Sequence, residues 1–403
     1  MKSKFKPEIR FSGFTVAWEQ RKFKDFIFKS GKRNTLGENY LACSVSNKLG
    51  LVSQTEQFDG GRLDTLDKTS YKLVHPNEFA YNPARINVGS IAFNNLNRTV
   101  IVSSLYVVLK MNEKLDNEYV LQFIKSQLFN DEVKRNTEGS VREYLFFENF
   151  KNIKFPYTPY KEEQIKIGKF LKQLDDIIEL HEKELTTLKQ TKQGFLKKMF
   201  PKEGEYVPEV RFQGFTGDWE KHKLSDMKDV RDGTHDSPKY FNVGFPLVTS
   251  KNLKENGLDM TDVSLISEED FQSINKRSKV DIGDILFGMI GTIGNPVLVN
   301  REGFAIKNVA LIKHGGKVTN EFLIQLLKSP IFEMFIRNEN AGNTQKFLSL
   351  SKIRNYQFLS PSYQEQIKIG DFFKNLDNTI NLHQRELDAL KETKKAFLQK
   401  MFI

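Results

Sequence analysis

The sequence has only one cysteine, Cys43, among its 403 residues, so no disulfide bond can form within the chain. It also lacks a long apolar segment, because the runs at residues 101–109 and 285–299 are too short or too rich in glycine to span a bilayer. The N-terminus has no continuous apolar stretch of the signal-peptide type. These absences predict a soluble, cytoplasmic protein without a membrane partner.

Motifs for catalysis are lacking as well. Residues 315–317 have neither the spacing nor the following Ser or Thr of a phosphate-binding loop, and the glycines of residues 288–294 do not follow the dinucleotide-binding pattern. Residues 82–85 share Asn-Pro with the Asn-Pro-Pro-aromatic loop of adenine methyltransferases but lack the second proline and the aromatic residue, so we expect a turn there. We therefore predict no catalytic, cofactor-binding or metal site in this chain.

Positive charge and aromatic residues are abundant. The chain has 61 Lys and Arg against 51 acidic residues, a net charge of +10, and the first 33 residues hold ten Lys or Arg and only three acids. This balance is typical of a polyanion-binding protein, although a solvated basic surface explains the charge equally well. A hydrophobic content of 39%, with 34 Phe and 12 Tyr, indicates a globular chain of two to four domains.

The sequence repeats itself in two blocks. Residues 7–19 reappear as residues 208–220, and residues 164–200 reappear as residues 366–402 with 23 of 37 positions identical. The long segments between these blocks, residues 24–157 and 225–359, barely resemble each other. This arrangement suggests two different binding domains on one symmetric frame.

The longer repeated block predicts a coiled coil. Its apolar residues alternate spacings of four and three, which is the heptad pattern, and each copy is long enough for a helix of about 55 Å. The internal twofold repeat requires the two helices to pair antiparallel. The core of the predicted seam consists of Leu174, Ile178, His181, Leu185 and Leu188 in the first helix and Leu376, Ile380, His383, Leu387 and Leu390 in the second.

His181 and His383 interrupt the seam near its middle, so an antiparallel pairing should bring them together. They either fix the register of the two helices or only fill a partly hydrated seam, and the sequence leaves both interpretations open. A metal site is the less favoured reading, since two His without nearby Cys or further His are too few ligands.

The variable segments predict two domains of similar mixed α/β (α+β) fold. In each, a β-like run precedes a helix-like run: residues 101–109 and 117–126 in the first, residues 306–312 and 320–329 in the second. The predicted boundaries are a first domain at 1–157, a central helix at 158–200, a second domain at 201–359 and a C-terminal helix at 360–403.

Polar loops in both domains combine turn residues with cations and amides, the groups that contact phosphates and base edges. Each loop is also compatible with an ordinary turn. The candidate DNA-binding residues are Lys32, Arg33, Asn82, Arg85, Asn87 and Arg142 in the first domain and Thr234, His235, Lys251, Asn252, Gln345 and Lys346 in the second. For His235, the lack of a nucleophile or a spaced carboxylate partner favours a binding loop over acid–base catalysis.

The order of these features resembles the specificity subunit of type I restriction-modification enzymes. The resemblance rests on the duplicated helix block, on the duplicated Pro-Glu-(Ile/Val)-Arg-Phe-x-Gly-Phe-Thr-x-x-Trp-Glu, and on Asp-Gly-Thr-His followed by Leu-Val-Thr-Ser-Lys-Asn-Leu. It covers nearly the whole chain. It implies two target-recognition domains, each reading one half of a split double-stranded DNA site, and an antiparallel coiled coil that separates them.

The resemblance also implies partners. Two methyltransferase subunits would bind S-adenosylmethionine and methylate adenine, and two restriction subunits would use ATP and Mg, whereas this chain itself would be non-catalytic. The helices would then act as a ruler that sets an unread spacer between the half-sites. Two other readings stay open: a free-standing bipartite DNA-binding scaffold or regulator, and methyltransferase activity in the chain itself.

Overall fold

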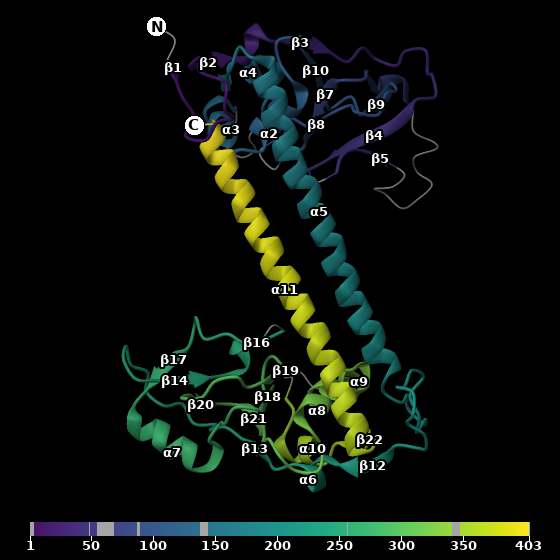
Figure 1. The fold of residues 1–403 in the computed structure, drawn as a ribbon, viewed down its shortest axis with the longest axis vertical. Helices are drawn as coiled ribbons and strands as arrows, with labels where there is room; N and C mark the ends of the chain where they lie inside the picture. The colour runs from purple at the N-terminus through teal and green to yellow at the C-terminus, as the bar shows by residue number, and fades with distance from the viewer. Residues whose placement is uncertain are drawn as a thin grey trace. The chain divides into compact units, whose positions relative to one another are not determined.

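The computed structural model describes residues 4–47, 49–54, 68–86, 89–137, 144–255, 257–340 and 347–402. The chain forms two compact units: unit 1 comprises Met1–His181 and Glu386–Ile403, and unit 2 comprises Glu182–Arg385. Each unit holds a mixed α/β domain and a part of both long helices, α5 (Lys161–Lys198) and α11 (Tyr363–Phe402) (Figure 1). Among the described residues, none of the helices has the length and apolar character needed to cross a membrane.

The elements of the two domains follow one another in a similar order. In unit 1 they are β1 (Lys4–Phe5), β2 (Trp18–Lys22), β3 (Ile27–Ser30), β4 (Leu41–Ser46), β5 (Gly50–Ser53), β6 (Lys72–Val74), β7 (Glu78–Tyr81), β8 (Ile91–Phe93), β9 (Val100–Val102), β10 (Val107–Met111), α2 (Asn117–Ile124), α3 (Gln127–Asn136), α4 (Phe147–Phe150) and β11 (Lys154–Tyr157). In unit 2 they are β12 (Glu220–Lys223), α6 (Leu224–Met227), β13 (Val230–Asp232), β14 (Phe245–Val248), β15 (Leu253–Lys254), β16 (Gly257–Leu258), β17 (Ser264–Ile266), α7 (Glu268–Ser278), β18 (Ile285–Gly288), β19 (Gly294–Leu298), β20 (Ala305–Ile306), β21 (Val309–Ile312), α8 (Asn320–Leu327), α9 (Pro330–Glu339), α10 (Leu350–Arg354) and β22 (Gln357–Ser360).

Both domains use one topology. An antiparallel four-stranded sheet has the order β3-β10-β7-β8 in unit 1 and β13-β21-β18-β19 in unit 2. A second sheet in each unit contains a parallel pair, β4 with β9 and β14 with β20. The helix pair α2 and α3 corresponds to α8 and α9. The predicted fold class, one mixed α/β fold used twice with two long helices, is confirmed.

Each core is closed by the end of one long helix. In unit 1 the buried Phe402 of α11 packs against Tyr119, with ring centroids 5.3 Å apart. In unit 2 Phe200, two residues after α5, packs in the same way against Phe322, at 5.6 Å. The repeated Met-Phe that ends both helix blocks is therefore part of the core, and it anchors each helix end to a mixed α/β domain.

The short repeated block anchors the start of each long helix. In unit 1 the Arg10 guanidinium donates two hydrogen bonds to the fully buried Glu163 carboxylate, at 2.5 and 2.9 Å. In unit 2 Arg211 donates two hydrogen bonds of 2.8 Å to the buried Glu365. The Arg and Glu that recur in the two repeats thus form one ion pair in each unit.

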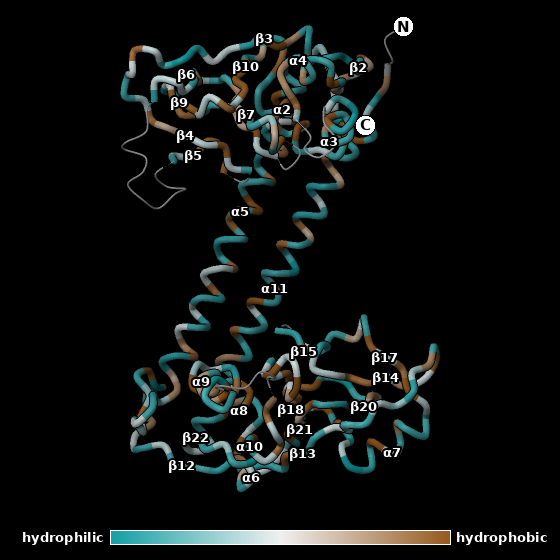
Figure 2. The backbone as a smooth tube through the Cα atoms, turned by 180° about the vertical axis from the view of Figure 1, so that it is seen from behind, coloured by the Kyte–Doolittle hydropathy of each residue, from teal (hydrophilic) through white to brown (hydrophobic). Residues whose placement is uncertain are grey.

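The helices run antiparallel within each unit, as predicted. In unit 1 Phe170 packs on Phe397, with centroids 4.9 Å apart, and a later residue of α5, Asp175, pairs with the earlier Lys394. In unit 2 Phe195 packs on Phe372 at 5.0 Å. Figure 2 shows brown and teal segments alternating along α5 and α11, as expected for helices with one apolar stripe.

The predicted seam positions are all buried or partly buried. The buried members are Leu185, Ile380 and Leu387, and the partly buried ones are Leu174, Ile178, His181, Leu188, Leu376, His383 and Leu390. Most of the positions between them are exposed.

Two lysines that interrupt the seam are neutralised by aspartates. Lys192 pairs with Asp377 at 2.5 Å, and Lys394 pairs with Asp175. All four residues belong to the repeated block, so the same pair is made once in each unit.

The two histidines of the seam lie in different units. His383 has its Nδ1 atom 3.8 Å from the Glu184 carboxylate. The approach of His181 to His383 remains a prediction, since the two residues belong to different units.

Candidate nucleic-acid interface

The strand directions bring the predicted loops of each domain to one sheet edge. In unit 1 β3 and β7 both run antiparallel to β10, which lies between them, so their C-terminal ends meet at the same edge. In unit 2 β13 and β18 flank β21 in the same way. The loops after these strands contain most of the candidate DNA-binding residues. We call this edge, with the loops that follow the two strands, the reading edge of each unit.

In unit 1 the first loop of the reading edge presents cations. Lys32 and Arg33 are exposed, while their backbone is fixed because Leu73 N donates to Lys32 O at 2.8 Å and Arg33 forms a bridge with Lys72. Burial lowers the pKa of Lys72, and the nearby charges of Lys29 and Arg33 lower it further. The side chains of Lys29, Lys32, Arg33 and Lys72 therefore place several cations beside the first loop.

The second loop of unit 1 is a turn, as predicted. Asn82 Oδ1 accepts a hydrogen bond from Ala84 N at 3.0 Å, and Arg85 N donates to Asn82 O at the same distance. The Asn82 side chain therefore shapes the turn, and the Arg85 side chain is exposed. Asn87 and Arg142, the other candidates of this unit, lie outside the described residues.

In unit 2 backbone hydrogen bonds fix the conformation of the first loop of the reading edge. Thr234 N donates to Ile306 O, and Asn308 N donates to Thr234 O, both at 3.0 Å. A Cβ atom on Gly233 would lie 2.2 Å from Ile306 O, so only glycine fits the position before Thr234. The Asp-Gly-Thr-His motif thus combines a buried acid, an obligatory glycine and two polar side chains at the edge.

His235 is held between two acceptors. Its Nε2 lies 2.9 Å from Asp232 Oδ2, and its Nδ1 lies 2.8 Å from Asn308 Oδ1. The hydrogen bond to Asp232, with a smaller effect of Asn308, raises the pKa of His235. Arg277 pairs with the other oxygen of Asp232. The raised pKa favours the charged imidazole, but Asp232 and Asn308 occupy both ring nitrogens, so His235 holds the loop in place and its N–H groups are not free for a ligand.

Lys251 and Asn252 have different environments although they are adjacent. Lys251 is exposed, 3.2 Å from Asp262. Asn252 is 2% exposed, accepts hydrogen bonds from Thr249 N and Oγ1, and donates to the carbonyls of Asp259 and Asp262. Its amide is fully used in holding the turn, so Lys251 is the residue of this pair that faces solvent.

The glycines at 288, 291 and 294 make a tight hairpin between β18 and β19. A Cβ atom on Gly288 would lie 2.3 Å from Thr292 O, and Gly291 and Gly294 have φ of 75° and 101°. The backbone of the hairpin therefore accounts for the three glycines without any ligand. Gln345 and Lys346 lie outside the described residues, but Phe347, which follows them, bridges Ile290 of the hairpin.

Sequence reasoning missed several residues at the reading edge of unit 2. Lys307 Nζ donates to Ser237 Oγ at 2.7 Å, and Asn308 supports His235 from a left-handed backbone with φ of 55°. Arg277 reaches Asp232 from α7. An Asn after an apolar strand is a recognisable turn signal, whereas the contact of Arg277 with a residue 45 positions away has no local signature.

One groove of unit 2 has the size of a small-molecule site. It has a volume of about 650 Å³ and lies between β19, α5, α8 and α11. Its lining mixes cations with acids, including the paired Lys192 and Asp377 together with Lys328 and Glu321. This balance of charge does not identify a phosphate-bearing cofactor.

The chain is similar to known proteins along most of its length. The model of the type I restriction modification DNA specificity domain matches residues 15–190 and again residues 216–392. The chain is 26% identical over 321 residues to the type I restriction enzyme MjaVIII specificity subunit of Methanocaldococcus jannaschii, covering 75% of this chain and 73% of that protein. With the putative type I restriction enzyme MjaX specificity subunit of the same organism, it shares 22% identity over 421 residues, covering 94% and 92%.

A solved structure shares the fold. The crystal structure of the type I restriction-modification system S subunit from M. genitalium matches with a TM-score of 0.66 at 15% identity, covering 99% of each chain. At this identity the likeness concerns the arrangement of the elements and not the residues of the reading edges.

Proposed function

The chain belongs to the type I restriction modification DNA specificity family, and from this premise we propose that it reads a bipartite DNA site. Unit 1 would contact one half-site and unit 2 the other, each through its reading edge. The observation that carries the proposal is the duplication of this edge with different side chains. Lys32 and Arg33 follow β3, whereas Thr234 and His235 follow the corresponding strand β13.

The chemistry of the two edges suits DNA. The exposed cations Lys32, Arg33 and Lys251 would fix the phosphate register, and Arg85 has the fork geometry that binds guanine in the major groove. Because the two edges differ, the half-sites would differ as well. The target would then be asymmetric although the frame repeats.

We propose that the chain is non-catalytic and directs partner subunits. Two methyltransferase subunits with S-adenosylmethionine would methylate adenine in each half-site, and two restriction subunits with ATP and Mg would cut the DNA. The helices α5 and α11 would set the unread spacer, with the half-sites about one turn of DNA, roughly 34 Å, apart.

Methylome sequencing of cells that carry this chain and its neighbouring methyltransferase gene tests the proposal. The expected result is methyladenine in a two-part motif with a spacer of fixed length. A continuous motif would refute bipartite reading. Failure of the chain to co-purify with a methyltransferase would instead support a free-standing DNA-binding scaffold.

A further inference from the structure

Both units carry an aromatic residue at the same place on the reading edge. Leu145 and Leu348 are fully buried, and their backbone N–H groups donate to carbonyls of the hairpin beside them, Pro83 O at 3.1 Å and Met289 O at 2.9 Å. The preceding residues are Tyr144 and Phe347. Since successive side chains of an extended segment point to opposite sides, a buried Leu turns its aromatic neighbour away from the core.

In unit 2 this aromatic belongs to an exposed apolar pair. Phe347 is 44% exposed and forms an antiparallel bridge with Ile290, which is 37% exposed. The backbone of Phe347 is held, because its N–H donates to Asn340 Oδ1 at 3.0 Å. The ring is therefore fixed at its backbone and open to solvent at its face. In unit 1 the matching ring of Tyr144 stacks on Phe146, with centroids 5.7 Å apart.

DNA carries an apolar group that could contact the exposed pair Phe347 and Ile290 at the reading edge. The 5-methyl group of thymine is the apolar feature that a base edge presents in the major groove, and apolar side chains such as Phe contact it. A ring without hydrogen-bonding groups cannot serve as a phosphate contact. Its exposure costs free energy in the unbound protein, and contact with a methyl group would recover that cost.

We propose that Phe347, together with Ile290, is a specificity-determining residue that reads the methyl group of one thymine in the half-site of unit 2. The inference rests on the proposed function and deepens it, since it names the chemical group that one side chain recognises. It predicts a position of the motif where thymine is preferred because of its methyl group.

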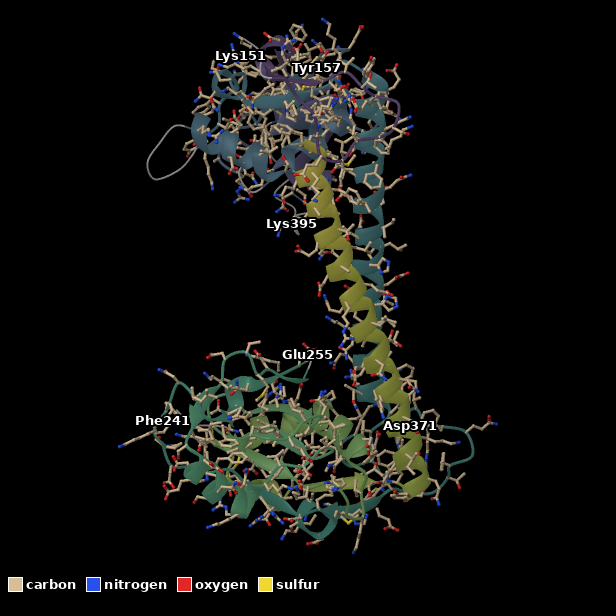
Figure 3. The ribbon with its side chains drawn as sticks, turned by 60° about the vertical axis from the view of Figure 1, so that its left-hand side comes forward. Lys151, Tyr157, Phe241, Glu255, Asp371 and Lys395 are labelled. Atoms are coloured by element: carbon tan, nitrogen blue, oxygen red, sulfur yellow. The ribbon has the colours of Figure 1, made fainter. Side chains whose placement is uncertain are left out.

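The test compares methylomes of the wild type and three variants, each expressed with its methyltransferase. In F347A one thymine position of one half-site should accept other bases, while the other half-site stays unchanged. F347L keeps an apolar side chain and should keep the preference for thymine. The matched control is I282A: Ile282 is 58% exposed and precedes β18, at the end of this strand opposite the reading edge. Phe241, which Figure 3 shows on the side of unit 2 away from Asp371 of α11, lies in the loop after β13 and is therefore not a suitable control.

Binding measurements with modified DNA leave the protein unchanged. Replacing the thymine at that position by deoxyuridine removes only the methyl group, and should weaken binding of the wild-type complex about fourfold, the effect of one buried methyl group. The same replacement should not affect F347A. An unchanged motif in F347A, equal weakening of wild type and variant by deoxyuridine, or parallel loss of both half-sites would overturn the inference. If the wild type shows no bipartite motif, the proposed function fails instead.

Discussion

Neutralising Glu163 should destabilise unit 1 more than neutralising Glu365 destabilises unit 2. Besides its two hydrogen bonds from Arg10, Glu163 accepts one from Trp18 Nε1 at 3.2 Å and one from Thr158 Oγ1 at 2.6 Å. In unit 2 the corresponding atom, Trp219 Nε1, has no hydrogen-bond partner among the described residues. Glu365 therefore lacks the hydrogen bond that Glu163 accepts from Trp18.

The magnitude follows from burial. Glu163 is fully buried and the Arg10 side chain is 11% exposed, so Glu163→Gln would leave a largely desolvated cation without its counter-charge. Removing one partner of a buried pair costs about 3–5 kcal/mol. The Trp18 and Thr158 hydrogen bonds to a charged acceptor should make the loss larger than in Glu365→Gln by about 1–3 kcal/mol.

Calorimetry measures this difference. For a unit of this size, about 4 kcal/mol corresponds to a fall in Tm of roughly 10 °C. Hydrogen exchange should show the loss of protection in α2 and the start of α5, which identifies unit 1 as the affected part. The control is Glu162→Gln, a change of the exposed neighbour, which should leave Tm unchanged. A Tm of Glu163→Gln within 2 °C of wild type, or a larger effect in Glu365→Gln, would refute the reasoning.

Further expected outcomes concern packing, pH and spacing. Gly168→Ala should lower Tm because its Cβ would lie 2.8 Å from a backbone nitrogen of α2, whereas Gly194→Ala, with no atom within 4 Å, should raise stability by about 0.5–1 kcal/mol. Hydrogen bonds from Lys279 and Lys313 lower the pKa of Asp281 from 3.8 to about 2, so its stabilisation is present above pH 4 and lost as pH falls to 2. Asp281→Asn should therefore be less stable than wild type at pH 7, and urea unfolding should show the difference shrinking below pH 4 and vanishing only as pH falls below 2. Deleting one heptad from each of α5 and α11 should change the spacer but not the half-sites in a methylome.

Periodicity and repetition made the frame predictable. A heptad seam depends only on local spacing, so the sequence identified the buried stripe of both helices, including the Leu185 and Leu387 positions that the structure buries. The similar order of elements in two dissimilar segments predicted one fold used twice. Both patterns can be recognised from the order of residues along the chain, without knowing which distant residues are in contact.

The polar residues were harder to predict because their roles depend on partners far along the chain. Asn252 is a residue type that is common in DNA-binding loops. Its side-chain amide, however, donates to the backbone carbonyls of Asp259 and Asp262. Glu163, in the first turn of a helix, is in a position typical of an exposed acid, and its burial depends on the counter-charge of Arg10, 153 residues earlier, and on the Trp18 indole. Sequence alone does not distinguish a polar side chain that faces a ligand from one that supports the loop.

Exchange of the first variable segment tests the central claim most directly. Residues 24–157 would be replaced by the corresponding segment of another member of the family, and the methylome of cells carrying the hybrid and its methyltransferase would be sequenced. Independent reading by each unit predicts that one half of the motif changes while the other half and the spacer stay the same. A hybrid in which both halves change, or in which neither does, would contradict it.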